Sequence, residues 1–369
     1  MLIEFSDDFI DVDFALDGEV ACCLNGVLLS ARNGWHLVIG SRDLLRKLWA
    51  AESVLSYPAR LAAKTILDQF ADIASTAEGL RSKVILSAKS EGVIRLDEYT
   101  WIISAKVFSH GLLSKPVLIG EDLTDTDMLL VAARHYQFEY KMTKARISLH
   151  HIGGGGNRTA AQFERFVRER NTGVLCITDS DKKYEGSLMK ETARLCEKVA
   201  NDYVWWAKHI ALPTHELENL LPLELIRAAA LDGGRPILSE RLKALESLPA
   251  SIRIFGDLKC GLKLRQIWGM NEGDPMKKFW IGVYSDLKRT GGFVCGCEGS
   301  RGAGEAECEC ELVPKLGEDL AKIVCNYLEK QTALDRVFSR SRKETLFAMW
   351  LEMGREVFEW GASARPSRL

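Results

Sequence analysis

Residues 174–181 read Val-Leu-Cys-Ile-Thr-Asp-Ser-Asp, a short apolar run that ends in two aspartates. A similar pattern occurs earlier, where the run Val-Leu-Ile-Gly at 117–120 is followed by Glu121. Continuous apolar runs of this length predict strands that are buried on both faces, as in a parallel sheet covered by helices. Acids at the carboxyl ends of such strands converge on the crevice in which ligands bind. The two segments therefore predict an α/β fold with acids gathered at one edge of its sheet.

The surrounding segment, 113–230, continues this alternation. Strands are predicted at 117–119, 146–152, 174–178 and 203–210, and helices at 126–134, 158–170, 187–201 and 215–229. Strands that alternate with helices of this length favour a parallel sheet flanked by helices. Four glycines at 153–156 lie between a strand and a helix, where the backbone can approach a ligand closely.

The 369 residues are enough for two or three compact units. Residues 1–112 mix apolar runs with a helical stretch at 58–77, which predicts an N-terminal α/β domain of unknown role. Residues 113–230 are the predicted sheet domain. Amphipathic stretches predict a mainly helical C-terminal region at 231–369, which is interrupted by a glycine- and cysteine-rich loop at 291–311.

Charge and motif content exclude several classes of protein. Lys and Arg number 49 against 51 Asp and Glu, so no global basic field attracts nucleic acid, and a polyanion must bind through a local patch or a metal. No Walker-type Gly-x-x-x-x-Gly-Lys-Ser/Thr loop is present, which excludes ATP hydrolysis by that route. The N-terminal residues lack the basic and apolar stretches of a secretory signal, and no long apolar segment follows. We therefore expect a cytoplasmic protein with no membrane partner.

Carboxylates at strand ends are the ligands that Mg²⁺ or Mn²⁺ prefers. The predicted metal ligands are Glu121, Asp125, Asp179, Asp181, Glu216 and Glu218. Asp179 and Asp181 can point to the same ion as the chain leaves the sheet, and Glu121 can hold a second ion with help from the others. Two such ions would clamp a phosphodiester, one activating water and the other stabilising the leaving oxygen. The sequence therefore predicts phosphodiester chemistry that depends on a divalent metal.

Each of these residues also has an ordinary structural interpretation. Asp-x-Asp alone occurs in surface turns, and Glu216 and Glu218 would also stabilise the dipole of a helix that starts nearby, so one of them can be purely structural. For His215, a structural role is favoured over a metal ligand or general base. Lys182, or its neighbour Lys183, is the best-placed contact for phosphate, because it follows the aspartate pair directly.

An acid after the first strand, a glycine turn after the second and Asp179-Ser180-Asp181 after the third resemble a TOPRIM domain, the metal-binding module of topoisomerases, primases and overcoming-lysogeny-defect nucleases. The later Glu-Leu-Glu-Asn-Leu-Leu-Pro, starting at Glu216, is similar to an acidic element of the nuclease branch, including effectors of PARIS-type antiphage defence. The resemblance covers about 115–228 and implies that 113–230 is a catalytic domain with Glu121, Asp179, Asp181 and Lys182 in its active site.

The chain departs from the family pattern at one position. Family members usually have glycine directly after the first acid, whereas this chain has Asp122, preceded by Gly120. An aspartate here can shift the turn or add a ligand. It also motivates an alternative in which the site is inactive and the chain is a regulatory or scaffolding subunit.

The loop at 291–311 carries two Cys-x-Cys pairs, Cys295 with Cys297 and Cys308 with Cys310. Four thiolates suit a structural Zn²⁺, which would supply the ordering energy that apolar burial cannot supply in so polar a segment. Zinc ribbons commonly use Cys-x-x-Cys, so a reduced loop without metal is the competing interpretation.

Together these features predict a metal-dependent nuclease with a TOPRIM-like domain. Topoisomerases of this kind need a nucleophilic tyrosine in a separate domain, for which we find no convincing position. The resemblance implies an ATPase or sensor partner on a separate chain and a role in antiphage defence. The residues do not distinguish DNA from transfer RNA as the substrate, and they leave open whether the chain forms a homo-oligomer.

Overall fold

The computed structural model describes residues 1–108, 110–200, 205–296, 307–330, 334–342 and 344–366. The chain divides into two compact units. The first comprises Met1–Cys176, Lys198–His209 and Leu351–Leu369, and the second comprises Ile177–Glu197 and Ile210–Trp350. The predicted fold class, α/β with a parallel sheet flanked by helices, is confirmed, and each unit is described separately below.

A five-stranded sheet opens the first unit. Its strands lie in the order β2-β1-β3-β5-β4, with β1 at Leu2–Phe5, β2 at Leu37–Ile39, β3 at Lys83–Ser87, β4 at Val93–Arg95 and β5 at Thr100–Ser104. All pairings are parallel except that of β4 with β5. The accompanying helices are η1 (Asp7–Asp11), α1 (Gly18–Arg32), α2 (Arg42–Ala50), α3 (Tyr57–Asp68), α4 (Phe70–Glu78) and η2 (His110–Leu113). Helices α1 and α4 both pack on β2.

The second sheet contains the strands predicted to carry the acids. Its order is β10-β9-β6-β8, with β6 at Val117–Gly120, β8 at His150–Gly153, β9 at Val174–Thr178 and β10 at Ala207–Ala211. β6 runs parallel to both β8 and β9. Val174 N–H donates to Trp206 O and Leu212 N–H donates to Thr178 O, so β10 runs parallel to β9. Every residue of β6 and β9 is buried, as expected for strands covered on both faces.

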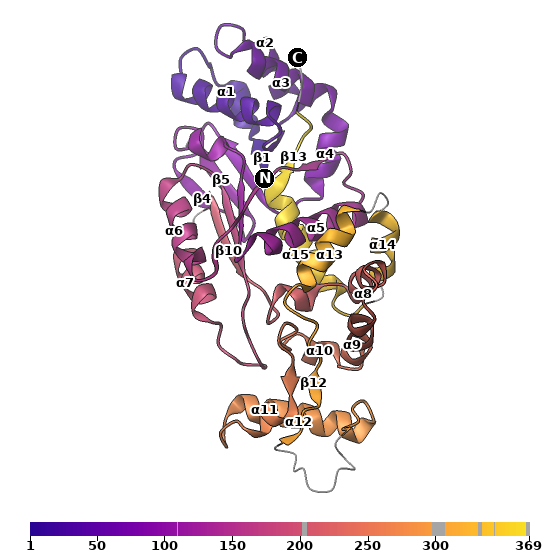
Figure 1. Ribbon diagram of the computed structural model, residues 1–369. Helices are drawn as coiled ribbons and strands as arrows, with labels where there is room; N and C mark the ends of the chain where they lie inside the picture. The colour runs from indigo at the N-terminus through magenta and orange to yellow at the C-terminus, as the bar shows by residue number, and fades with distance from the viewer. Residues whose placement is uncertain (109, 201–204, 297–306, 331–333, 343, 367–369) are drawn as a thin grey trace. The chain divides into compact units, whose positions relative to one another are not determined.

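Helices cover both sides of this sheet. Helix α6 (Thr159–Glu169) lies on one side, and α5 (Leu123–Glu139) and α15 (Phe347–Gly361) lie on the other (Figure 1). After α15 the chain adds β13 (Ala362–Ser363), which pairs antiparallel with β7 (Arg146–Ile147). The buried carboxylate of Glu359 accepts the N–H groups of Arg81 and Ser82 at 3.1 and 3.2 Å. The end of the chain is thus part of the first unit.

Gly354 allows α15 to approach α5 closely. A Cβ built at Gly354 would lie 2.2 Å from the carbonyl oxygen of Ala132, a backbone atom that cannot rotate away. Gly354→Ala should therefore destabilise the protein by about 1–3 kcal/mol in urea unfolding. Gly282, inside α12 (Pro275–Thr290), has nothing within 4 Å of the same position. Gly282→Ala is the matched control and should stabilise by about 0.5–1 kcal/mol; equal effects of the two substitutions would refute the close-packing explanation.

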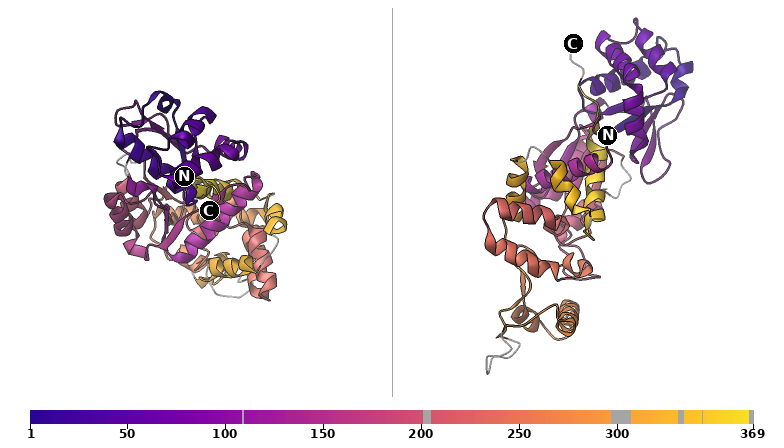
Figure 2. Two further views of the ribbon diagram at one scale, coloured as in Figure 1. Left: turned by 90° about the horizontal axis from the view of Figure 1, so that it is seen from above. Right: turned by 90° about the vertical axis from the view of Figure 1, so that its right-hand side faces the viewer.

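The second unit is mainly helical. Its elements are η4 (Leu217–Leu220), α8 (Leu223–Asp232), α9 (Pro236–Glu246), α10 (Ala250–Arg253), β11 (Leu262–Lys263), α11 (Leu264–Trp268), α12, β12 (Glu311–Val313), α13 (Leu320–Glu329) and α14 (Leu334–Ser341). Helix α8 packs on α9, α13 and α14, and the right-hand view of Figure 2 shows α8 and α9 side by side. The short strands β11 and β12 pair antiparallel, and α11 packs on both β11 and α12.

The prediction of a single helix at 215–229 is wrong. The chain instead forms the 3-10 helix η4, leaves helical geometry at Leu221 with φ -58° and ψ 127°, and starts α8 at Leu223. Pro222 explains the break, because proline has no N–H to donate and disfavours helical geometry in the residue before it. Glu216 and Glu218 therefore belong to a short turn rather than to the first turn of a long helix.

Three further predicted elements differ from the structure in their bounds. The strand predicted at 146–152 is split into β7 and β8, because Ser148 N–H donates to Gly361 O at 2.7 Å and β7 pairs with β13, whereas β8 joins the second sheet. The helix predicted at 187–201 is α7, which runs from Glu191 to Ala200. Residues 203 and 204 of the strand predicted at 203–210 lie outside the described residues, and the observed β10 extends to Ala211.

Candidate metal centre

The loop after β9 is tied to the loop after β10 by hydrogen bonds within the second unit. Asp179 Oδ1 accepts the N–H of Leu217 at 3.0 Å. Asp181 N–H donates to the carbonyl oxygen of His215 at 2.9 Å. The Asp-x-Asp turn and the acidic segment at 214–218 are therefore held together, as the sequence predicted for acids that follow neighbouring parallel strands.

The residue between the two aspartates serves as an anchor. Ser180 is fully buried, and its hydroxyl donates to Thr214 O at 2.5 Å. Asp181 has a left-handed backbone with φ 53°, which aspartate tolerates better than most residues. Its carboxylate forms an ion pair with Lys190, 2.5 Å from Asp181 Oδ1 to Lys190 Nζ. This anchoring holds both aspartate side chains of the turn in half-buried positions.

Glu216 and Glu218 are buried carboxylates that share one cation. Their relative exposures are 6% and 3%, and Lys259 Nζ lies 3.7 Å from Glu216 Oε2 and 3.4 Å from Glu218 Oε1. Oε2 of each glutamate is buried without a hydrogen-bond donor in the described part of the chain. A buried carboxylate oxygen without a donor is costly, and a bound cation would satisfy it.

A buried amide holds the turn that carries these glutamates. Asn219 Oδ1 accepts the N–H of Glu216 at 2.9 Å, and its Nδ2 donates to Arg253 O and Gly256 O, each at 2.8 Å. His215 N–H also donates to the carbonyl of Ile254 at 2.7 Å. The segment that follows α10 is thereby fixed against the acidic turn.

This packing brings a further acid to the cluster. One ligand atom each from His215, Glu216 and Asp257 lies within 4.8 Å of the other two. His215 Nδ1 lies 3.1 Å from Lys182 O, and His215 Nε2 lies 3.5 Å from Glu216 Oε1. Asp257 was not predicted from the sequence, because nothing in Phe-Gly-Asp-Leu-Lys at 255–259 distinguishes a ligand from an ordinary turn. Lys190 was missed for the same reason.

Burial changes the acid–base behaviour of two members of this cluster. The pKa of Glu216 is raised to about 8, and burial of the carboxyl group is the largest cause. The ammonium of Lys259 opposes this shift, while the charges of Glu218 and Asp257 add to it. Burial also lowers the pKa of His215, although the charge of Asp181 works in the opposite direction. Near neutral pH the imidazole is therefore neutral, and Glu216 retains its proton unless a cation replaces that proton.

The raised pKa of Glu216 gives an expected pH dependence of stability in buffer without added metal. Below pH 4.5 the carboxyl group is protonated in both states and contributes nothing. Between pH 4.5 and about 8 the unfolded state ionises first, so the free energy of unfolding falls as pH rises. Glu216→Gln should remove this fall in urea unfolding measured from pH 5 to 8. The exposed Glu318→Gln should keep it, and parallel curves for wild type and Glu216→Gln would contradict the assignment.

Glu121 and Asp125 lie in the first unit. Glu121 directly follows β6, and its carbonyl accepts the N–H groups of Gly155 and Gly156 at 3.0 and 3.1 Å. Two of the glycine-turn N–H groups, which the sequence suggested for ligand contact, therefore bind the backbone after β6. A Cβ at Gly153 would meet the backbone nitrogen of Leu123 at 2.8 Å, so this close approach requires a glycine.

Asp122 and Asp125 form a capping box at the start of α5. Asp122 Oδ1 accepts the N–H of Asp125, and Asp125 Oδ2 accepts the N–H of Asp122, both at 3.0 Å. This cap accounts for Asp122, the departure from the TOPRIM pattern, as a residue that starts the helix. It also gives Asp125 a structural role, whereas its prediction as a metal ligand stays a prediction.

Lys182 and Lys183 follow the aspartates with half-buried and exposed side chains, respectively. Their backbone carbonyls are engaged: Lys182 O faces His215 Nδ1, and Lys183 O accepts the indole N–H of Trp280 at 3.0 Å. The backbone of both lysines is thus fixed beside the acidic cluster. Their predicted role as phosphate contacts is an untested prediction.

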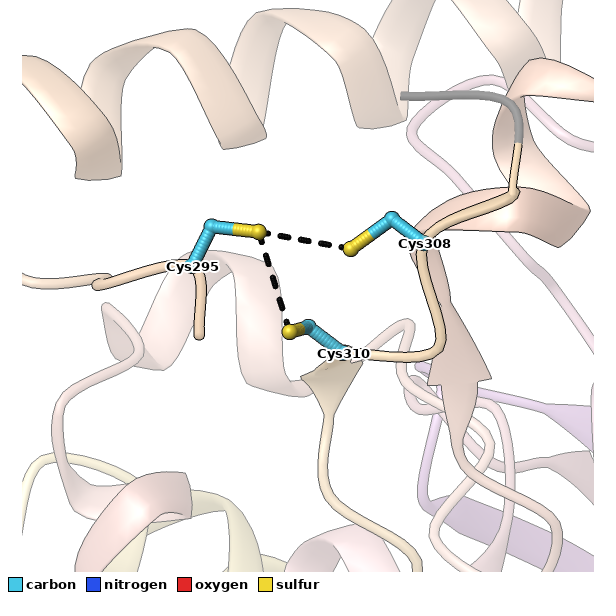
Figure 3. Close-up of side chains that lie close together, drawn as sticks. All are labelled: Cys295, Cys308 and Cys310. Atoms are coloured by element: carbon cyan, nitrogen blue, oxygen red, sulfur yellow. Dashed lines mark hydrogen bonds between the residues drawn. The ribbon is translucent and has the colours of Figure 1, made fainter. Parts of the chain in front are cut away.

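A separate group of thiols lies in the second unit. Cys295 Sγ is 3.3 Å from Cys308 Sγ and 3.7 Å from Cys310 Sγ (Figure 3). Thiolates about 2.3 Å from a tetrahedral Zn²⁺ lie roughly 3.8 Å apart, so these three sulfurs fit such an ion. Cys297, the fourth predicted ligand, lies outside the described residues. The main chain of Cys308 and Cys310 is held by the start of α11, since Cys310 O accepts Leu264 N–H and Cys308 O accepts Arg265 N–H.

Comparison with known proteins gives no relative for this chain: no family model, no curated protein and no solved structure matches it. Among the described residues, no helix is both long and apolar enough to cross a membrane.

Proposed function

We propose that the protein is a divalent-metal-dependent nuclease that hydrolyses phosphodiester bonds of DNA or RNA. One observation carries the proposal: the Asp179–Asp181 turn is hydrogen-bonded to the segment that carries Glu216 and Glu218, next to buried carboxylate oxygens without hydrogen-bond donors. A site of this composition suits a hard cation such as Mg²⁺ or Mn²⁺. Such a cation is the usual means of neutralising a phosphodiester in a protein whose net charge is -2.

The parallel pairing of β6 with β9 supports a TOPRIM-like fold for this sheet. β6 and β9 are parallel neighbours, with Val117 opposite Val174; Glu121 follows β6, and Asp179 follows β9. We propose that Glu121, Asp179 and Asp181 are the metal ligands of the catalytic domain, assisted by Glu216, Glu218 and Asp125. A bound Mg²⁺ or Mn²⁺ would supply charge neutralisation and a more acidic water.

The chain supplies the charges around that metal. Lys182 or Lys183 would contact a substrate phosphate, since both directly follow the aspartates. Lys259, shared by Glu216 and Glu218, would limit their mutual repulsion and hold the two carboxylates in place.

Asp122 bears on the alternative of an inactive scaffolding subunit. That alternative assumes that an aspartate in the turn after Glu121 distorts the site. The capping box with Asp125 accommodates Asp122 as an exposed helix cap, and the Glu121 carbonyl is held by two glycine N–H groups. These contacts favour the active enzyme over the scaffold.

We further propose a structural Zn²⁺ bound by Cys295, Cys308 and Cys310, with Cys297 as the fourth ligand. The separations of the three described sulfurs support this. An ATPase or sensor partner on a separate chain, and a role in antiphage defence, follow from the TOPRIM resemblance alone.

The proposal is tested by incubating the full chain with plasmid, linear DNA and total transfer RNA, each with Mg²⁺, with Mn²⁺ or with a chelator. We expect cleavage of one substrate class with metal and none with chelator. A parallel series with cell extract supplies any required partner. Absence of cleavage in every arm would contradict the nuclease proposal and favour the scaffolding subunit.

A further inference from the structure

We propose that His215, Glu216 and Asp257 form a metal site that takes a divalent transition metal such as Mn²⁺ through one imidazole nitrogen and two carboxylates. The site shares Glu216 with the centre proposed above. It adds a nitrogen ligand and an acid, Asp257, that the sequence did not single out. Its existence does not depend on nuclease activity and is tested by metal binding alone.

The distances suit a single ion. One ligand atom from each of the three residues lies within 4.8 Å of the other two, and His215 Nε2 is 3.5 Å from Glu216 Oε1. Two ligand atoms about 2.1 Å from one ion are typically roughly 3–4 Å apart. The three residues therefore need little movement to share an ion.

The orientation of His215 is that of a metal ligand. A carbonyl oxygen can only accept, so the contact of Nδ1 with Lys182 O places the proton on Nδ1. In the resulting neutral imidazole, Nε2 carries the lone pair, and Nε2 lies 3.5 Å from Glu216 Oε1. A backbone carbonyl on one nitrogen and an open lone pair on the other is the usual setting of a metal-binding histidine.

Once Glu216 is ionised, its Oε1 and the unprotonated Nε2, 3.5 Å apart, repel each other unless a cation lies between them. The second oxygen of Glu216, Oε2, gives an independent indication. It is buried without a hydrogen-bond donor in the described residues, in a side chain only 6% exposed. Lys259 Nζ, 3.7 Å from Oε2, offsets part of this cost without donating a hydrogen bond to Oε2, so the carboxylate still gains from a bound divalent cation.

The charges around the cluster are compatible with a bound cation. Lys259 is shared between Glu216 and Glu218, and Lys190 is paired with Asp181. Asp257 Oδ1 accepts the N–H of Cys260 at 2.7 Å, which fixes the carboxylate in its turn. With these ammonium groups shared or already paired, the cluster of carboxylates keeps a net negative charge.

The nitrogen ligand sets the class of metal. Mg²⁺ prefers oxygen ligands and retains its water, whereas imidazole favours transition metals. We therefore infer that Mn²⁺ binds here more tightly than Mg²⁺ does.

The test is electron spin-echo spectroscopy of the full chain loaded with Mn²⁺, which detects coupling of the ion to a ligand nitrogen. The wild-type chain should show coupling of Mn²⁺ to an imidazole nitrogen. Excess Mg²⁺ should reduce the amplitude of this coupling only slightly. His215→Asn should abolish the coupling and weaken Mn²⁺ binding at least roughly tenfold, because asparagine can keep the bond to Lys182 O but offers nothing at Nε2. His150→Asn, an exposed site in the first unit, is the matched control and should change neither.

Asp257→Asn is a second variant that keeps the acceptor for Cys260 N–H, and it should weaken Mn²⁺ binding while the nitrogen coupling stays. No coupling in the wild-type chain, or coupling that persists in His215→Asn, would overturn the proposal. If His215→Asn does not fold, the nitrogen coupling in the wild-type chain and the Mn²⁺ affinity of Asp257→Asn still test the proposal. Coupling without any cleavage would refute the nuclease alone, and cleavage without coupling would refute this site alone.

Discussion

Asp179→Asn is expected to reduce metal-dependent cleavage roughly 100-fold or more while the protein stays folded. Asparagine keeps the oxygen that accepts Leu217 N–H at 3.0 Å, so the link between the two loops survives. It removes the negative charge that a divalent ion requires. The loss should appear in the cleavage rate at saturating substrate and should be partly offset by higher Mn²⁺ concentrations.

Asp319→Asn is the matched control for this substitution. Asp319 is an exposed aspartate of the second unit and has no side-chain hydrogen bond at the start of α13. Its substitution should leave cleavage unchanged. Full activity of Asp179→Asn, with intact metal dependence, would show that the carboxylate after β9 is not a ligand.

Cys308→Ser is expected to cause the second large effect, the loss of the proposed zinc. Cys308 is 2% exposed, and a serine hydroxyl is a far weaker zinc ligand than a thiolate. Zinc content per chain should fall from one to well below one. The amides of Arg265 and Leu264, which donate to Cys308 O and Cys310 O, should exchange with solvent at least roughly tenfold faster.

Two further measurements separate zinc from simple packing. Cys22→Ser, at an exposed cysteine of the first unit, should keep both the zinc content and the slow exchange. A strong chelator added to the wild-type chain should reproduce the exchange of Cys308→Ser. If the wild-type protein carries no zinc and the chelator does not change its amide exchange rates, the loop is held by apolar contacts and the zinc assignment is wrong.

The second sheet was largely predictable because its strands are buried on both faces. The predicted strand at 174–178 coincides with β9, and the predicted strand at 117–119 lies within β6. Continuous apolar runs of this length, bounded by acids, predict strands that are buried on both faces. Asp179 and Glu216 were predicted as ligands for the same reason, since each follows a strand of this sheet.

What could not be predicted depends on contacts distant in sequence. Asp257 lies beside Glu216 because Asn219 binds the carbonyls of Arg253 and Gly256 and His215 N–H donates to Ile254 O, and no local sequence pattern indicates such contacts. The pairing of β13 with β7 likewise joins residues more than 200 positions apart. The helix predicted at 215–229 failed because Pro222 separates η4 from α8.

The most direct test of the account is the location of bound metal. Crystals of the full chain grown with Mn²⁺, and measured where manganese scatters anomalously, should show a strong peak in contact with Asp179 or Asp181 and with Glu216. The peak should disappear in Asp179→Asn crystals grown the same way. A map with no manganese at these carboxylates, or with manganese only elsewhere on the chain, would contradict the claim that the loops after β9 and β10 form the metal centre.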